Sequence, residues 1–131
     1  MRLLVVDDFA RWRDFVLEKL RENHNLRVIG VASDGLEAVQ KAEELQPDLI
    51  LLDIGLPSLN GIEVARQIRK VSPKSKILFV SQESSADVVQ GAFDAGAHGY
   101  VLKGDARREL LEGVNAVLRG ERFVGTRFSD S

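Results

Sequence analysis

Five short stretches rich in apolar residues recur along the chain, and each is followed by a polar residue or a turn. They span residues 3–6, 26–31, 49–52, 77–80 and 99–102. A short, nearly continuous apolar run bounded by turn residues predicts a strand buried on both faces, as in a parallel sheet. Residues 49–52 are the clearest case, because four apolar residues stop at Asp53 and are followed by the strand breakers Gly55 and Pro57.

Segments with helical periodicity separate these runs. From Phe9 to about Asn23, apolar residues recur every three or four positions, which predicts an amphipathic helix. Four more helices are expected, and their N-cap candidates are Asp34, Asn60, Ser84 or Ser85, and Asp105. Their expected ends are Pro47, Ser72-Pro73, Gly96 and Gly120. The alternation predicts an α/β fold with a five-stranded parallel sheet, right-handed crossovers and helices on both faces.

The length of 131 residues and the hydrophobic content of 44% fit one domain with a full core. We assign residues 1–120 to this domain and residues 121–131 to a tail or the start of a linker. Phe123 and Val124 are expected to pack back onto the domain. We also expect the natural protein to continue beyond residue 131, because this ending has the composition of a linker.

Composition narrows the possible functions. The net charge of −2 gives no basic character suited to nucleic acid or an anionic membrane, so we expect no direct nucleic-acid binding by this chain. No apolar stretch approaches membrane-spanning length, and the apolar run in MRLLVVDD is too short for a signal peptide. The absence of cysteine excludes disulfides and thiolate chemistry and fits a cytoplasmic location.

Polar residues stand at the ends of four predicted strands. Asp7 and Asp8 follow the first strand, Asp53 the third, and Ser81 and Lys103 the fourth and fifth. Because the carboxyl ends of parallel strands meet at one edge of the sheet, these side chains are expected to converge on one pocket. Two carboxylates about 5 Å apart repel by roughly 3 kcal/mol at an effective dielectric constant near 20, which favours a bound cation. Hard oxygen ligands with open positions suit Mg²⁺.

Such a pocket is equipped for phosphoryl transfer. A carboxylate can attack a phosphoryl group to give an aspartyl phosphate, and a metal ion neutralises charge on the transferring oxygens. Lys103 is expected to pair with the phosphoryl group, and Ser81 to donate a hydrogen bond to one of its oxygens.

The segments VVDD, LILLDIGLP-x-x-NG, VS and AGAHGYVLK resemble the receiver domain of bacterial two-component response regulators over about residues 3–119. The resemblance implies a flavodoxin-like fold with strand order 2-1-3-4-5. It implies Asp53 as phosphoacceptor and Lys103 as phosphoryl ligand. It further implies a Mg²⁺ site formed by Asp7, Asp8, Asp53 and the Gly55 carbonyl, a switch pair of Ser81 and Tyr100, and a modulating role for Gln82 and Glu83.

The ending VLKGDARRELLEGVNAVLRGERFV is similar to the NarL/FixJ (LuxR-type) class. That similarity implies a histidine kinase as donor, a homodimer on phosphorylation, and transcription regulation by a helix-turn-helix domain that this chain lacks. Three departures stand out. Lys103-Gly104 replaces a common Lys-Pro and is expected to be trans. Gln82 stands where a small residue is common and is expected to crowd the phosphoryl group. Leu56 replaces a common methionine, with little expected consequence.

A phosphorylated receiver would not be an enzyme, apart from self-catalysed phosphotransfer and autodephosphorylation. Two other functions are alternatives to this reading. A pseudo-receiver would bind partners without phosphorylation, and the unusual Gln82 keeps this alternative open. A haloacid-dehalogenase-like phosphatase would also use an aspartate nucleophile, Mg²⁺ and a lysine. That family requires Asp-x-Asp, however, whereas Asp7 and Asp8 are adjacent.

Overall fold

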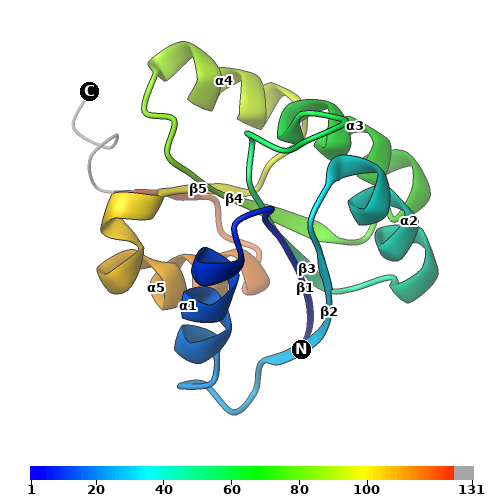
Figure 1. The fold of residues 1–131 in the computed structure, drawn as a ribbon. Coiled ribbons are helices and arrows are strands. Elements are labelled where there is room, and N and C mark those ends of the chain that lie inside the picture. The colour runs from blue at the N-terminus through cyan, green and yellow to red at the C-terminus, as the bar shows by residue number, and fades with distance from the viewer. Residues whose placement is uncertain (126–131) are drawn as a thin grey trace.

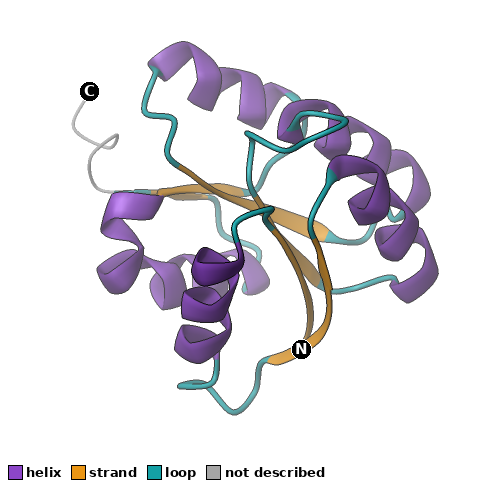
Figure 2. Ribbon diagram, viewed as in Figure 1, coloured by secondary structure: helices purple, strands orange, loops and turns teal. Residues whose placement is uncertain are grey.

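The apolar runs form the strands of a parallel sheet that lies between two layers of helices (Figure 1; Figure 2). The computed structural model describes residues 1–125, so residues 126–131 of the predicted tail lie outside the described part of the chain. The strands are β1 (Arg2–Val6), β2 (Arg27–Ala32), β3 (Leu49–Leu52), β4 (Lys76–Ser81), β5 (Gly99–Leu102) and β6 (Phe123–Val124). The helices are α1 (Ala10–Leu20), α2 (Gly35–Leu45), α3 (Gly61–Val71), α4 (Ala86–Asp94) and α5 (Ala106–Leu118), and a 3-10 turn, η1 (Lys103–Asp105), precedes α5.

Within residues 1–125 the sheet has six strands in the order β2-β1-β3-β4-β5-β6, all parallel, so the prediction of five strands was wrong. The sixth strand is the Phe123–Val124 segment, which was expected only to pack back. Its pairing with β5 is marked by backbone hydrogen bonds from Phe123 N to the O of His98, the residue before β5 (3.1 Å), and from Gly125 N to Tyr100 O (3.0 Å). A strand of two residues is too short to show periodicity in the sequence. The domain boundary at residue 120 stays a prediction.

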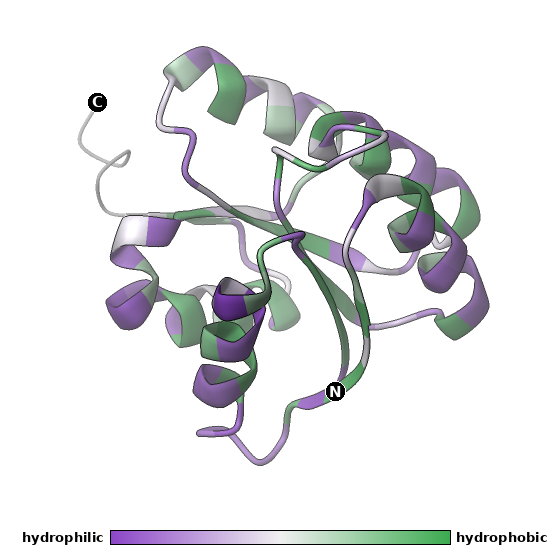
Figure 3. Cartoon of the chain, viewed as in Figure 1, coloured by the Kyte–Doolittle hydropathy of each residue, from purple (hydrophilic) through white to green (hydrophobic). Residues whose placement is uncertain are grey.

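Alternating side chains of the central strand divide the core into two layers. All four residues of β3 are buried. Ile50 and Leu52 pack with residues from α2, α3 and α4, whereas Leu49 and Leu51 pack with residues from α1 and α5. The ribbon shows the same two helix layers, and apolar residues line the sheet and the helix faces turned toward it (Figure 1; Figure 3). The buried strand predicted from residues 49–52 is therefore confirmed.

Capping residues fix where several helices begin. Asp34 accepts a hydrogen bond from Glu37 N (2.9 Å), and Asn60 accepts one from Glu63 N (3.0 Å), so both are N-caps as predicted. Ser85 occupies the N-cap position of α4, but its side chain makes no capping hydrogen bond. Asp105 likewise does not cap α5, because the chain enters this helix through the 3-10 turn and the Asp105 carboxylate pairs with Arg108 (3.2 Å).

Two glycines terminate helices in backbone conformations that other residues avoid. Gly96 follows α4 with φ of 105°, and Gly120 follows α5 with φ of 90°, as their positions in the sequence suggested. Within residues 1–125 every peptide bond is trans, including the one between Lys103 and Gly104. No helix in that same range is long and apolar enough to cross a membrane.

Candidate functional site

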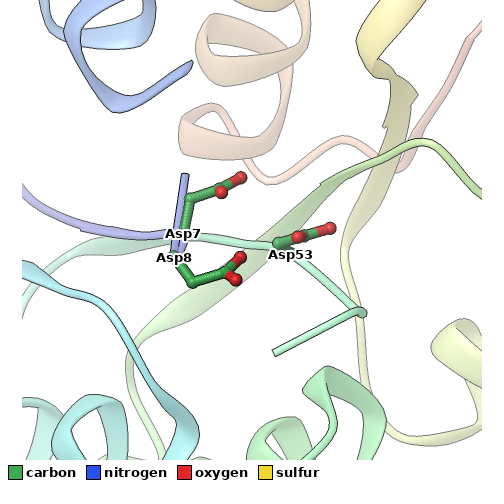
Figure 4. A group of neighbouring side chains, drawn as sticks. All are labelled: Asp7, Asp8 and Asp53. Carbon is green, nitrogen blue, oxygen red and sulfur yellow. The ribbon is translucent and has the colours of Figure 1, made fainter. Parts of the chain in front are cut away.

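Three carboxylates meet where β1 and β3 end. The two strands are neighbours, with Val6 in register with Leu52, and the Asp53 N–H donates to the Val6 carbonyl (3.2 Å). One carboxylate oxygen from each of Asp7, Asp8 and Asp53 lies within 4.8 Å of the other two (Figure 4). Asp7 and Asp53 are buried, whereas Asp8 is exposed. The predicted convergence of these side chains is therefore present in the fold.

Lys103 brings a positive charge to the same place from the end of β5. Its Nζ lies 2.7 Å from Asp7 Oδ2 and 3.6 Å from Asp53 Oδ2. The ammonium thus contacts two of the three carboxylates, and its side chain is only 12% exposed. Asp7 is held further by the Phe9 N–H, which donates to Asp7 Oδ1 (2.9 Å).

Burial and the charge of Lys103 shift the pKa of the Asp53 carboxyl in opposite directions. Burial raises its pKa above the usual value, and the neighbouring Asp7 charge acts in the same direction. The Lys103 ammonium and hydrogen bonds from the backbone of Ile54 and Gly55 lower the pKa but do not cancel the effect of burial. Any cation that enters the pocket would stabilise this carboxylate, because it is buried and lies close to another negative charge.

Ser81, Glu83 and Tyr100 form a second group beside the carboxylates. The Glu83 N–H donates to Ser81 Oγ (3.1 Å), and the Tyr100 hydroxyl donates to the Glu83 carbonyl (2.7 Å). Tyr100 is fully buried, and burial raises its pKa to about 12, against a smaller opposing effect of a hydrogen bond with the Ser81 side chain. The loop after β4 is therefore joined to β5 through the Tyr100 side chain.

A cavity of about 330 Å³ joins the two groups. It is lined by Asp8, Phe9, Asp53, Gly55, Ser81, Gln82, Glu83 and Lys103. Gln82 and Gly55, which the sequence analysis placed at the site, thus border the same space as Asp53. Asp7 is buried and contacts the cavity residue Lys103.

The first helix supplies contacts that the sequence analysis did not assign to the site. Arg13 Nη1 donates to the Asp7 carbonyl (2.6 Å), and the Trp12 ring lies beside Lys103, with 5.2 Å between Nζ and the ring centroid. Both residues stand about one helical turn after Asp8, so their spacing was the available signal.

A parallel α/β sheet with three carboxylates and a lysine at its carboxyl edge defines the class of flavodoxin-like proteins with an acidic site at the strand ends. The sequence profile of the response regulator receiver domain matches residues 3–115, and the chain belongs to this family. It is therefore a phosphorylation-controlled signalling domain, and the resemblance seen in its motifs is confirmed.

Individual relatives point to the NarL/FixJ-like group. The chain is 34% identical over 121 residues to the response regulator protein VraR of Staphylococcus aureus, covering 92% of this chain and 58% of that protein. A LuxR-family two-component response regulator from Aurantimonas sp. SI85-9A1 superposes with a TM-score of 0.94 at 30% identity, covering 98% of this chain and 92% of the other. The receiver domain of the putative response regulator NarL from Mycobacterium tuberculosis gives a TM-score of 0.87 at 30% identity, covering 92% and 97%. The chain spans 58% of the length of the curated relatives it matches, which carry further sequence.

Proposed function

We propose that Asp53 accepts a phosphoryl group from a histidine kinase in a Mg²⁺-dependent reaction. The observation that carries this proposal is the arrangement of charges around Asp53. Its carboxylate lies among two other carboxylates within 4.8 Å and has the Lys103 ammonium at 3.6 Å. Asp53 is also the acid that ends the central strand and lines the cavity, where a donor has access to it.

The donor atoms of the site fit a magnesium ion. Carboxylates of Asp7, Asp8 and Asp53 and the Gly55 carbonyl would hold it, and these are the hard oxygen ligands that Mg²⁺ prefers. When bound, the ion supplies positive charge that offsets repulsion between the acids and an anionic donor. The exposed Asp8 is the ligand that such an ion would meet first from solvent.

In the transfer step, an Asp53 carboxylate oxygen forms a new bond to phosphorus while the bond between phosphorus and the leaving atom breaks. The leaving group retains the electron pair of that bond. Lys103 is placed to pair with the phosphoryl oxygens, because its Nζ is already 3.6 Å from Asp53 Oδ2. Ser81 lines the same cavity as Asp53 and would donate its hydroxyl hydrogen to another of these oxygens.

The phosphoryl group adds a charge of about −2 beside the loop that follows β4. Movement of Ser81 toward that charge would pull on Glu83, whose carbonyl accepts the Tyr100 hydrogen bond. Tyr100 would therefore act as the switch residue, and Gln82 and Glu83 would modulate it. The reorganised surface around α4 would expose or hide a partner site.

The output is proposed to lie outside this chain. Like the LuxR-family relatives, the whole protein would regulate transcription in the cytoplasm through a helix-turn-helix domain, and phosphorylation would favour a homodimer suited to two DNA half-sites. The chain itself would not touch nucleic acid. Sedimentation velocity with and without beryllofluoride, a stable phosphoryl mimic, tests dimerisation; an unchanged mass would refute it for residues 1–131.

Incubation with Mg²⁺ and acetyl phosphate tests the phosphoacceptor. Mass spectrometry should find one added phosphoryl group that is labile to alkali, as an acyl phosphate is. The adduct should be absent from Asp53→Asn and present in the matched control Asp14→Asn, whose acid is exposed on α1. An adduct that survives in Asp53→Asn would move the acceptor elsewhere. Absence of any adduct from the wild type would favour the pseudo-receiver, a partner-binding module without phosphorylation.

A further inference from the structure

Trp12 makes a contact that links the first helix to the phosphoryl site. Its ring centroid lies 5.2 Å from Lys103 Nζ, which is within the range of an attractive cation–π interaction. The Trp12 ring also contacts the ring of Phe15, at 4.9 Å between ring centroids. Phe15 lies one turn further along α1, and the structure records no cation–π contact between its ring and Lys103 in the described residues.

The position of the Lys103 ammonium depends on contacts at the end of a flexible side chain. A lysine side chain has four rotatable carbon–carbon bonds. Holding it in one conformation costs up to about 2 kcal/mol of conformational entropy. Lys103 begins the 3-10 turn, and the space beside the next residue, Gly104, is open. The stem of Lys103 is shielded from solvent, and its ammonium contacts Asp7 (2.7 Å), Asp53 (3.6 Å) and the Trp12 ring.

The two carboxylates and the Trp12 ring differ in how their interaction with Lys103 would change during the proposed phosphoryl transfer. The two carboxylates are the groups that a magnesium ion and a phosphoryl group would engage, so both change their interaction with Lys103 as the proposed reaction proceeds. The indole ring carries no charge and takes no part in the bond changes. It can therefore hold the ammonium near Asp53 when Asp7 is drawn away by a cation.

We propose that Trp12 is a positioning residue that keeps the Lys103 ammonium in place to receive the phosphoryl oxygens of the donor. The inference rests on the proposed phosphorylation of Asp53 and goes beyond it, because it assigns a role to a residue outside the acidic pocket. Trp12 acts only through Lys103. The alternative is that Trp12 has only a structural role in core packing, since it also packs against the apolar layer under α1 and α5.

Kinetics with acetyl phosphate separate the two roles. Trp12→Leu keeps an apolar side chain but removes the ring, and it should raise the half-saturating acetyl phosphate concentration by about 3- to 10-fold with a smaller change in the maximal rate. Trp12→Phe should restore this concentration to within about 2-fold, because a ring is again present. Phe15→Leu is the matched control: it removes apolar packing on the same helix and should leave the half-saturating concentration unchanged.

A double substitution shows whether the effect passes through the lysine. In the Lys103→Gln background, adding Trp12→Leu should cause no further change, since no cation remains for the ring to hold. An equal effect of Trp12→Leu in both backgrounds, or an effect no larger than that of Phe15→Leu, overturns the proposal in favour of a core role.

A spectroscopic measurement tests the contact on which the positioning role depends, without phosphorylation. The Cε protons of Lys103, identified by their loss in Lys103→Gln, should be shifted upfield by the indole ring current in the unmodified wild type. The shift should vanish in Trp12→Leu and persist in Phe15→Leu. An unshifted Lys103 signal in the wild type would overturn the positioning role. A wild type that accepts no phosphoryl group but shows this shift would refute the proposed function and leave the contact established.

Discussion

Lys103 and Asp7 form an ion pair in which Nζ and Oδ2 are 2.7 Å apart, and both side chains are largely shielded from solvent. This is closer than the 3.6 Å between Lys103 and Asp53, the proposed nucleophile. A carboxylate assigned to a metal site is thus already paired with a cation of the protein. A divalent ion entering the pocket must compete with the ammonium for Asp7.

That competition predicts the effect of removing the lysine charge. Lys103→Gln should bind Mg²⁺ several-fold more tightly than the wild type, because the pocket keeps three acids and loses its positive charge. Isothermal titration calorimetry measures the affinity. Lys74→Gln removes an exposed lysine before β4, at the opposite edge of the sheet, and should bind like the wild type. An affinity for Lys103→Gln equal to or below that of the wild type would show that the two cations do not compete.

Removing the charge of Asp8 should have the opposite effect on the Mg²⁺ affinity. Its carboxylate is exposed and lies within 4.8 Å of the other two, so it adds negative charge where a hydrated ion enters. Asp8→Asn should weaken Mg²⁺ binding by about tenfold, on the scale of one charge interaction at a partly solvated site. Asp14→Asn, on the exposed side of α1, serves as control. Equal affinities for Asp8→Asn and the wild type would remove Asp8 from the metal site.

Much of this site follows from how the chain distributes its apolar residues. The unbroken run at 49–52 had to be a buried strand, and the acid that follows it, Asp53, therefore had to stand at the carboxyl edge of the sheet. Asp7 and Lys103 follow other parallel strands and reach the same edge. The caps Asp34 and Asn60 were readable because side chain and helix start are adjacent in sequence.

The features that the sequence did not reveal depend on contacts between distant backbone segments. The sixth strand exists because the Phe123 and Gly125 N–H groups meet the free edge of β5, which no local pattern records. The Tyr100 hydroxyl donates to the backbone carbonyl of Glu83. Every residue has such a carbonyl, so the sequence does not indicate which one accepts. Asp105 has the right residue type for a cap, but a 3-10 turn alters how the chain enters α5.

Burial of Asp53 predicts a pH-dependent gain in stability when its charge is removed. Because burial raises the Asp53 pKa in the folded protein, the folded state holds this proton at a higher pH than the unfolded state does. Stability is therefore lost as pH rises through the interval between the two pKa values. Without divalent cations, Asp53→Asn should be more stable than the wild type at pH 7, and the difference should shrink toward about pH 4.

Denaturant unfolding at the two pH values measures this difference. Asp14→Asn should give no comparable trend, since its carboxyl is exposed. If Asp53→Asn were less stable than the wild type at pH 7, the Asp53 carboxylate would be stabilised in the folded protein and its pKa would be lowered instead.

Gly61 allows α3 to start directly against the backbone of Asp53, the proposed phosphoacceptor. A Cβ atom at this position would lie 2.1 Å from the Asp53 carbonyl oxygen, so Gly61→Ala requires the backbone to move. We expect a loss of at least about 2 kcal/mol in the free energy of unfolding, together with a slower reaction at Asp53. Gly91→Ala in α4 is the matched control, because its Cβ would meet only Ile62 at 3.6 Å. It should be neutral or stabilising by up to about 1 kcal/mol. Similar thermal stabilities for the two variants would show that the Asp53 segment has room to shift.

Gln82 is one of the three predicted departures from the receiver pattern, and it lies near the proposed phosphoacceptor. It follows Ser81 directly and lines the same cavity as Asp53. We expect a long amide side chain there to occupy space that a water molecule would need for in-line attack on a phosphoryl group at Asp53. Gln82→Ala should therefore speed autodephosphorylation, by about 3- to 10-fold if an unobstructed path lowers the barrier by roughly 0.7–1.4 kcal/mol.

The rate is measured by following loss of the phosphoryl group after acetyl phosphate is removed. Gln90→Ala provides the control, since Gln90 is an exposed amide on α4 whose side chain donates to Asp94 (2.9 Å) away from the cavity. It should leave the lifetime unchanged. Gln82→Asn, which shortens the side chain by one methylene, should give an intermediate rate if bulk is the cause. A lifetime in Gln82→Ala equal to that of the wild type would mean that the amide turns out of the path once Asp53 is phosphorylated.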